Sequence, residues 1–303
     1  MRDLGDLQSF LGIRVTRDWE NQRIWLSQQS YIEEVARRFQ LANLQGTPST
    51  PMSSMKLVPN EDVADQATVH VYQRKVGSIN YAAVITRPDI SKSCSELASF
   101  LTNPSKTHMA EINRCIQYLY GTRQQSILFD GKRTFDREFE VFTDASFADD
   151  PDTRRSSQGW LMRLYGGPVA WNANKQATVT TSSTEAELLG LSFAAKETIA
   201  TMRLFAGLRF HLDERLIIWC DNKQTIRLVV QELQRLRTAL RHVDVHQCWI
   251  RQEVQRGTFS VEYIETSEMA ADGMTKILSR VKFNAFVKQL GLVPVPEPIV
   301  SVS

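Results

Sequence analysis

The first 70 residues change their pattern of apolar and polar positions twice. Residues 7–15 and 23–27 are apolar-rich runs typical of strands, and the polar residues around 18–21 predict a turn, so the pattern indicates a β-hairpin. From residue 31 the apolar positions recur at the spacing of a helix. Residues 46–70 are rich in proline, serine and other polar residues, which indicates a linker.

Residues 71–135 carry mainly the helical pattern. The predicted helices cover residues 79–85, 90–101 and 108–120. Pro88 interrupts this pattern, and Asp89 follows it near the start of the next helix, where we expect its side chain to act as a cap. Gly121 ends the last helix, so this part of the chain is predicted to be a small helical region.

From about residue 136, strand-like runs alternate with helix-like ones. The expected strands cover residues 139–142, 159–165, 169–171, 177–181, 215–220 and 259–264. The expected helices cover residues 184–207, 223–230, 242–255 and a segment from 269 onward. Ser182, Ser183 or Thr184 suits the N-cap of the long helix. The prolines after Gly291 predict a disordered tail over residues 291–303.

Four acidic residues of the second half occupy informative positions. Asp144 and Asp221 lie where an apolar, strand-like run gives way to small polar residues. Glu187 lies near the start of the long helix, and Asp272 near the start of the last one. Burying carboxylates at such points costs free energy unless positive charge neutralises them. Because clustered carboxylates suit two hard divalent cations, and two cations suit in-line cleavage of a phosphodiester, these residues indicate a metal-dependent nuclease.

Composition narrows the classes of protein that fit. The 303 residues allow two domains, and 36 Lys and Arg against 34 Asp and Glu leave the charge nearly balanced, so nucleic-acid binding would need local basic patches. No apolar run is long enough to span a membrane and no signal peptide is visible, so no membrane partner is expected. The four cysteines have no Cys-x-x-Cys spacing, which favours reduced thiols in an intracellular protein over a zinc site.

Six motifs follow one another in an order that resembles a known family. They are Phe142-Thr143-Asp144-Ala145-Ser146, Asp152-Thr153-Arg154-Arg155-Ser156-Ser157-Gln158-Gly159, Ser182-Ser183-Thr184-Glu185-Ala186-Glu187, Cys220-Asp221-Asn222, Arg241-His242-Val243-Asp244-Val245 and Ala271-Asp272-Gly273-Met274-Thr275-Lys276. Together they resemble the ribonuclease H part of the copia-type retrotransposon reverse transcriptase–ribonuclease H polyprotein. Segments 4–7, 10–15, 76–81 and 86–90 look like the end of its polymerase and the connecting helices, so the resemblance covers about residues 4–290.

The resemblance implies a fold and a domain order. The fold would be α/β (α+β), a ribonuclease H-like mixed five-stranded sheet with helices, preceded by a small helical connection region and a β-hairpin. The domains would be a terminal fragment of reverse transcriptase (1–45), a linker (46–70), a helical connection region (71–135), a ribonuclease H-like domain (136–290) and a disordered tail (291–303). The aromatic-x-Asp-Asp motif of the polymerase would precede Phe10, so this chain is expected to lack the polymerase catalytic core and not to synthesise DNA alone.

The resemblance also implies a reaction. Asp144, Glu187, Asp221 and Asp272 would bind two Mg²⁺ or Mn²⁺ ions, one activating the attacking water and the other stabilising the leaving 3′ oxygen. The substrate would be the RNA strand of an RNA–DNA hybrid, recognised by its 2′-hydroxyls, phosphates and groove shape. The other partner would be the rest of the reverse transcriptase/integrase polyprotein. The location would be a cytoplasmic virus-like particle, with nuclear entry needed only for integration.

Some acidic residues allow two interpretations. Glu185 competes with Glu187 for the metal, but residues two apart cannot share a helical face. The family pattern matches Glu187, which leaves Glu185 as a favourable first-turn charge. Phe147-Ala148-Asp149-Asp150 mimics the polymerase motif, but the polar residues that follow do not form the second strand which that motif needs, so a solvated loop is expected. Asp244 is expected to be a surface acid.

The candidate nucleic-acid contacts are Arg154, Arg155, Lys175, Asn222, Arg241 and His242. Arg235, Arg237 and Arg251 fit phosphate contacts and a solvated face equally well. His242 and His246 are four residues apart on a helix, yet without further ligands they suit an exposed or nucleic-acid-facing pair better than a metal site. Cellular ribonucleases H carry a histidine on the loop before the last Asp. Residues 264–268 fill that loop here without one, with Glu265 and Glu268 as candidate substitutes.

Two rival functions are compatible with part of this pattern. A truncated, catalytically inert retroelement remnant with nucleic-acid binding at most would explain the missing polymerase core and the missing loop histidine. An integrase or transposase of the same superfold would place a Glu last among three acids, whereas here the Glu is second and Asp272 is last.

Overall fold

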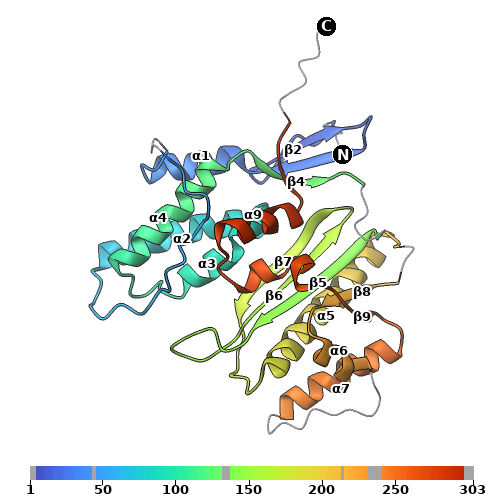
Figure 1. Cartoon of the computed structure of the whole chain (residues 1–303). Helices are drawn as coiled ribbons and strands as arrows, with labels where there is room; N and C mark the ends of the chain where they lie inside the picture. The colour runs from blue at the N-terminus through green and yellow to red at the C-terminus, as the bar shows by residue number, and fades with distance from the viewer. Residues whose placement is uncertain (1–4, 43–45, 132–136, 213–214, 231–240, 297–303) are drawn as a thin grey trace. The chain divides into compact units, whose positions relative to one another are not determined.

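The computed structural model describes residues 5–42, 46–131, 137–212, 215–230 and 241–296. The chain forms two compact units, which are Met1–Gly131 together with Ile277–Ser303, and Lys132–Lys276. Figure 1 shows the elements of both units. The unit boundaries differ from the expected domains, because residues 277–290 group with the N-terminal half and not with the nuclease-like part.

The first unit contains an antiparallel sheet with the order β1-β2-β3-β4-β10. Its strands are β1 (Ser9–Phe10), β2 (Ile13–Asp18), β3 (Arg23–Ser27), β4 (Gln125–Phe129) and β10 (Leu292–Pro294). The predicted hairpin is present as β2 and β3, and β3 continues the sheet by pairing with β4.

The expectation of a wholly disordered tail is wrong for residues 292–294. Val293 pairs with Ser126, whose hydroxyl donates to the Val293 carbonyl at 2.8 Å. Pro294 is tolerated because β10 is an edge strand, where a missing backbone N–H need not interrupt a ladder.

The helices of the first unit are α1 (Gln29–Arg38), α2 (Gln66–Ile85), the 3₁₀ helix η1 (Pro88–Ile90), α3 (Ser91–Ala98), α4 (Lys106–Gly121) and α9 (Arg280–Gln289). The expected linker is ordered over most of its length. Met52 and Leu57 are buried, and the Ser53 amide donates to Glu111 on α4 at 2.9 Å. α2 begins within it at Gln66, because Asp65 caps the helix by accepting from the Thr68 amide.

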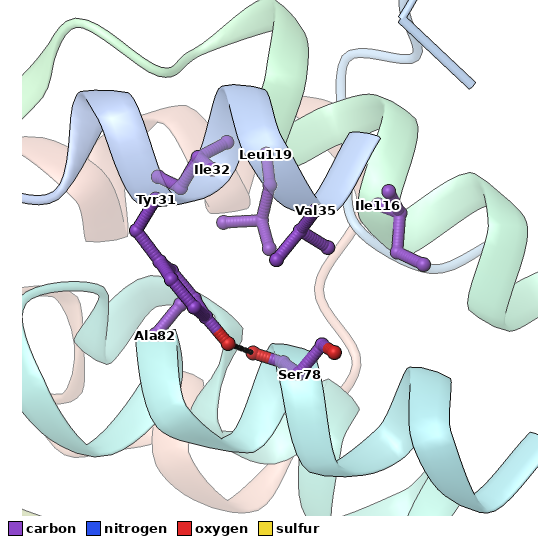
Figure 2. A pocket seen from close by; sticks show the side chains of 7 residues that line it. All are labelled: Tyr31, Ile32, Val35, Ser78, Ala82, Ile116 and Leu119. Atoms are coloured by element: carbon purple, nitrogen blue, oxygen red, sulfur yellow. Dashed lines mark hydrogen bonds between the residues drawn. The ribbon is translucent and has the colours of Figure 1, made fainter. Parts of the chain in front are cut away.

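Three helices of the first unit, α1, α2 and α4, meet at a small pocket (Figure 2). The Tyr31 hydroxyl from α1 donates to the Ser78 carbonyl on α2 at 3.0 Å. The lining residues are Tyr31, Ile32, Val35, Ser78, Ala82, Ile116 and Leu119. None of these seven carries a charge, and the pocket lies where the three helices pack against one another.

The second unit contains a mixed sheet with the order β7-β6-β5-β8-β9. Its strands are β5 (Phe139–Ser146), β6 (Ser157–Leu164), β7 (Gly167–Lys175), β8 (Ile217–Cys220) and β9 (Ser260–Tyr263). The first three strands pair antiparallel, whereas β8 and β9 add in parallel to β5. This arrangement confirms the expected ribonuclease H-like mixed five-stranded sheet.

The helices of this unit are α5 (Ser183–Gly207), α6 (Lys223–Val230), α7 (Arg241–Gln255), the 3₁₀ helix η2 (Thr266–Glu268) and α8 (Asp272–Thr275). In Figure 1 the long helix α5 runs along one face of this sheet. Leu188 and Leu191 from α5 are fully buried in one cluster with Val141, Met162 and Ile218 from the sheet. The site residues are therefore attached to a packed core.

The strand expected at residues 177–181 is absent, since these residues form bends and loop. The Thr181 amide and hydroxyl both donate to Glu185, each at 2.7 Å, and Ser182 caps α5 by accepting from the Glu185 amide. The β-branched residues that predicted a strand therefore lead into a helix N-terminus.

All four cysteines are free, and three of them are buried. The scattered thiols expected from the sequence thus form no disulfide. No helix among the described residues is long and apolar enough to cross a membrane.

Candidate metal centre

Three of the four predicted acids converge at one edge of the second unit's sheet. Asp144 lies near the end of β5, and Asp221 directly follows β8. Because β5 and β8 are parallel, these two positions meet at the same edge. Glu187, in the second turn of α5, completes the group. Single carboxylate oxygens of Asp144, Glu187 and Asp221 all lie within 4.8 Å of one another.

Asp272 approaches this acid cluster from α8 but is not one of the three mutually close carboxylates. A lysine connects it to them. The Lys276 ammonium lies 3.4 Å from Asp144 Oδ2 and also donates to Asp272 Oδ1. The Thr275 hydroxyl donates to the same oxygen of Asp144. The short helix α8 and the residue that follows it thus supply an acid, a hydroxyl and an ammonium to the site.

Burial controls the electrostatics of the acid cluster. It raises the pKa of Asp144 to about 6, although the positive charge of Lys276 and the Thr275 hydroxyl oppose the rise. Burial, and then the charges of Asp144 and Asp221, raise the pKa of Glu187 well above its ordinary value. For Lys276, burial favours a lower pKa, but the charge of Asp144 and the hydrogen bond to Asp272 outweigh it and raise the pKa.

The chemistry of the acid cluster suits a hard divalent cation. All of the close donors are carboxylate oxygens, the ligand type that Mg²⁺ and Mn²⁺ prefer, whereas zinc sites use Cys and His. Glu187 is 7 % exposed, and its Oε2 has no hydrogen-bond partner among the described residues. A buried carboxylate oxygen without a partner is costly, and a bound cation would satisfy it. The residues present therefore fit the expected metal.

The structure separates the roles of the two glutamates on α5. Glu185 accepts both donors of Thr181, so it stabilises the N-terminus of the helix. Glu187 faces Asp144 and Asp221. The arrangement agrees with the assignment of Glu187 to the metal.

A residue of η2 donates a hydrogen bond to Asp221. The helix η2 lies in the loop that carries a histidine in cellular ribonucleases H. The Thr266 hydroxyl donates to Asp221 Oδ2 at 2.9 Å. The sequence singled out Glu265 and Glu268 for this loop, but the residue that contacts an acid of the site is Thr266. The sequence offered little indication of Thr266, because a single threonine in a polar loop belongs to no recognisable motif.

The residues predicted to contact nucleic acid differ in their exposure and in their hydrogen-bond partners. Arg154 and Arg155 are exposed on the loop between β5 and β6. Lys175 forms an ion pair with Asp150, and the Asn222 side chain accepts from the Thr225 amide at the start of α6. The side chains of Arg241 and His242, and all of Arg235 and Arg237, lie outside the described residues.

Two further polar residues of α7 have structural positions. His246 Nδ1 lies 2.7 Å from the Ser192 hydroxyl on α5, so His246 links the two helices. Arg251 donates to the Leu228 carbonyl at 2.6 Å, at the end of α6. The second contact favours a structural part for Arg251 over the phosphate contact that the sequence also allowed. Asp244 lies in the first turn of α7 and is partly exposed, in agreement with a surface acid.

The loop that mimics a polymerase motif has a structural use. Asp149 accepts from the amide and the hydroxyl of Ser157, each at 2.7 Å. Asp150 is 8 % exposed and accepts from Lys175 and from the amides of Asp152 and Thr153. The expectation of a solvated loop is therefore wrong for Asp150. Both acids close the loop between β5 and β6.

We expect Asp150→Asn to lower the free energy of unfolding by about 1–3 kcal/mol at pH 7, because it weakens the hydrogen bonds that a buried carboxylate accepts. Burial favours a higher pKa for Asp150, but the Lys175 ammonium and two backbone amides lower the pKa below its ordinary value. A lowered pKa stabilises the fold above the unfolded value near ~4, and this contribution is lost as the pH falls through the folded pKa. The difference between parent and variant should therefore narrow from pH 7 towards pH 3 in urea denaturation. Exposed Asp152→Asn is the control, and a difference independent of pH would contradict the argument.

Gly159 on β6 sets the distance between the sheet and α8. It pairs with Asp144, and a Cβ added at Gly159 would overlap with Cβ of Met274. Gly159→Ala must therefore displace α8, and with it Thr275 and Lys276.

For Gly159→Ala we expect a loss of about 1–3 kcal/mol in unfolding free energy, together with weaker Mn²⁺ binding by calorimetry. Gly190→Ala on α5 is the matched control, since its added Cβ would meet Ala145 Cβ at an ordinary 3.6 Å. This control should be neutral or up to about 1 kcal/mol more stable. Equal unfolding free energies and equal Mn²⁺ affinities in the two variants would show that the close packing of α8 on Gly159 does not determine stability or metal binding.

The sequence did not identify Gly159, Thr275 or Lys276 as members of the site. Thr275 and Lys276 belong to a motif that was recognised, but only Asp272 received a role. They follow Asp272 by three and four positions, a spacing that places side chains on one helical face. That spacing was the available signal.

Comparisons with known proteins find transposon Pol polyproteins among the similar sequences. The chain is 36% identical over 299 residues to the retrovirus-related Pol polyprotein from transposon TNT 1-94 of Nicotiana tabacum, covering 96% of this chain and 22% of the relative. It is 30% identical over 298 residues to the corresponding polyprotein from transposon RE1 of Arabidopsis thaliana, covering 98% and 20%. The chain thus spans about a fifth of the length of these relatives. It matches no protein-family model.

Among solved structures, a ribonuclease H1 isolated from compost by a metagenomic approach is similar to this chain with a TM-score of 0.36 and 14% identity. The match covers 46% of this chain and 92% of that protein. The assignment of the fold depends instead on the strand order and directions of the second unit's sheet.

Proposed function

The chain belongs to the copia-type retrotransposon Pol polyproteins, and from this premise we propose that its second unit is a ribonuclease H that hydrolyses the RNA strand of an RNA–DNA hybrid. The proposed cofactor is a pair of Mg²⁺ or Mn²⁺ ions. The proposed partners are the hybrid and the remainder of the polyprotein. A place in a cytoplasmic virus-like particle stays a prediction.

The observation that carries this proposal is the convergence of Asp144, Glu187 and Asp221, with Asp272 joined to them through Lys276. Among the described residues, no other group of three or more such side chains comes close enough to hold a metal ion. The unpartnered Oε2 of Glu187 supports a site that is completed by a cation.

The chain's own residues would hold and orient the reacting groups. Divalent ions, when bound, supply positive charge that stabilises the attacking and leaving oxygens of phosphodiester hydrolysis. Asp144 and Asp221, near the carboxyl ends of the parallel strands β5 and β8, would be ligands held in place by the sheet. Thr275 orients Asp144, and Thr266 orients Asp221. Outer partners of this kind tune metal affinity and activity.

Exposed basic residues near the end of β5 support a nucleic-acid substrate. Arg154 and Arg155 lie on the loop that begins after Ser146, the last residue of the strand that carries Asp144. Both are exposed, and we propose that they contact the phosphates of a bound duplex. Such contacts position a hybrid without reading its sequence, which agrees with recognition by shape and 2′-hydroxyls.

The first experiment is cleavage of a hybrid with labelled RNA by the whole chain, with Mg²⁺, with Mn²⁺ and with chelator. We expect loss of the RNA strand that depends on the metal, with single-stranded RNA and duplex DNA left intact. Hybrid binding without cleavage by a folded sample would favour the inert remnant. Cleavage that persists in chelator would contradict a metal mechanism.

A further inference from the structure

Lys276 places a positive charge inside the acid cluster. Its ammonium lies 3.4 Å from Asp144 Oδ2 and donates to Asp272 Oδ1. The Asp144 side chain is 2 % exposed, whereas that of Lys276 is 39 % exposed, so the lysine reaches a buried carboxylate from a position that is itself open to solvent. The two acids that Lys276 joins come from β5 and α8.

The acid cluster needs this charge when it holds no metal. Three carboxylates lie within 4.8 Å of one another, Asp272 is joined to them through Lys276, and Asp144 and Glu187 are buried. Like charges in a poorly solvated site repel one another strongly, and a nearby ammonium offsets part of that repulsion. Two other lysines among the described residues of this unit have other positions, since Lys175 pairs with Asp150 and Lys223 lies 4.2 Å from the centre of the Tyr263 ring.

A metal ion and the ammonium would require the same oxygens. Asp144 Oδ2 accepts from the Thr275 hydroxyl and forms an ion pair with Lys276, and Asp272 Oδ1 accepts from Lys276. An ion that binds Asp144 Oδ2 or Asp272 Oδ1 competes with the Lys276 ammonium for that oxygen. Displacement of the ammonium is sterically feasible, because lysine is a compact charge on a flexible four-carbon stem and its side chain is partly exposed.

We propose that Lys276 is a tethered cation that neutralises the acid cluster in the free protein and competes with a divalent ion for Asp144 and Asp272. This inference rests on the proposed metal site and adds a residue that limits its occupancy. Metal binding in the absence of nucleic acid is then weaker than the carboxylates alone would allow. Lys276 is a positioning residue that acts on the acids and not on the substrate.

The test is calorimetric titration of Mn²⁺ into the whole chain without nucleic acid, so that no turnover is involved. The variants are Lys276→Met, which keeps the length of the side chain without its charge, and Lys276→Gln, which keeps a hydrogen-bond donor. Lys282→Met on α9 is the matched control, because Lys282 is exposed. We expect both Lys276 variants to bind Mn²⁺ roughly 10-fold more tightly than the parent, equivalent to about 1.4 kcal/mol. The control should match the parent.

Thermal unfolding gives a second readout. Without metal, Lys276→Met should unfold at a lower temperature than the parent, because the repulsion among the acids is no longer offset. Saturating Mn²⁺ should raise its unfolding temperature by more than it raises that of the parent. Circular dichroism before each titration ensures that the variants are folded.

The outcomes separate the inference from the proposed function. Equal or weaker Mn²⁺ affinity in both Lys276 variants, with clear binding by the parent, would overturn the competition and leave the metal site standing. Weaker affinity in particular would mean that Lys276 only holds α8 in place. No Mn²⁺ binding by the parent or by any variant would overturn both the competition and the metal-dependent nuclease.

Discussion

Asp144→Asn should reduce hybrid cleavage by about 100-fold or more, because even the outer partners of metal ligands change affinity or activity by about 10–100-fold and Asp144 is expected to contact the metal itself. Asp221→Asn should have a similar effect. Each change removes one charge from the acid cluster while keeping the size of the side chain. The measurement is the initial rate of RNA cleavage at saturating Mg²⁺, with Mn²⁺ affinity by calorimetry as a second readout.

The loss of activity should not come from unfolding. Burial raises the pKa of Asp144 to about 6, so its charged form is unfavourable in the metal-free protein. Asn removes that penalty but also weakens the contacts from Thr275 and Lys276. Because these effects oppose each other, the unfolding free energy of metal-free Asp144→Asn should stay within about 1 kcal/mol of the parent.

Asp244→Asn on α7 is the control for the removal of an acid outside the site. It should cleave at the parental rate, because Asp244 is not a member of the acid cluster. Metal-dependent cleavage that survives in both Asp144→Asn and Asp221→Asn would exclude the proposed catalytic site. Unfolding of either variant would show instead that the acids are needed for the fold.

Arg87→Met should have the largest effect on stability, a loss of about 3–5 kcal/mol in the first unit. The side chains of Arg87 and Asp89 are fully buried and form two hydrogen bonds, at 2.9 and 2.7 Å. Tyr118 donates to Asp89 at 2.6 Å, and Arg87 also donates to Thr122. Removing the guanidinium leaves the Asp89 carboxylate buried with a single neutral donor among these partners.

This network corrects the expectation that Asp89 caps a helix. Asp89 makes no side-chain capping hydrogen bond in η1, and its carboxylate instead connects η1 to α4 through Tyr118. Asp89 does have a structural role, as expected, but it bonds to Tyr118, which is distant in the sequence.

Arg123→Met is the matched control for this prediction. Arg123 pairs with Glu33 at 3.0 Å, but both side chains are about one-third exposed. An ion pair of this kind contributes about 0–1 kcal/mol. Urea denaturation measures the loss, and hydrogen exchange of amides in α2 and α4 assigns it to the first unit.

A double variant tests whether the buried pair acts as a unit. Arg87→Met combined with Asp89→Asn should cost less than the sum of the two single changes, since it leaves no unpaired charge. Equal losses in Arg87→Met and Arg123→Met would show that burial does not determine the strength of these pairs.

Local sequence patterns were sufficient for most elements of the second unit. The strands around Asp144 and Asp221 and the helix that carries Glu187 follow from apolar period and capping residues within a few positions of each acid. The same local information failed at 177–181, where β-branched residues suit a strand but hydrogen bonds to Glu185 lead the chain into α5. Propensity is a weak guide where a side chain caps a helix.

Contacts between distant segments were beyond the reach of these patterns. The tail strand β10 depends on the free edge of β4, and the boundary after Lys276 depends on which core residues 277–290 join. The local sequence predicts neither the pairing of β10 nor this boundary, because a short edge strand and an amphipathic helix can pack on many surfaces.

The sequence by itself determined the identities of the acids and the elements that carry them, since both depend on residues close together in the chain. Tertiary structure decided which acids meet. The parallel pairing of β5 and β8 brings Asp144 to Asp221, and the close approach of α8 at Gly159 brings Lys276 between Asp144 and Asp272. The physical reason is that the cost of gathering buried carboxylates, and the cation that offsets it, exist only after the chain has folded.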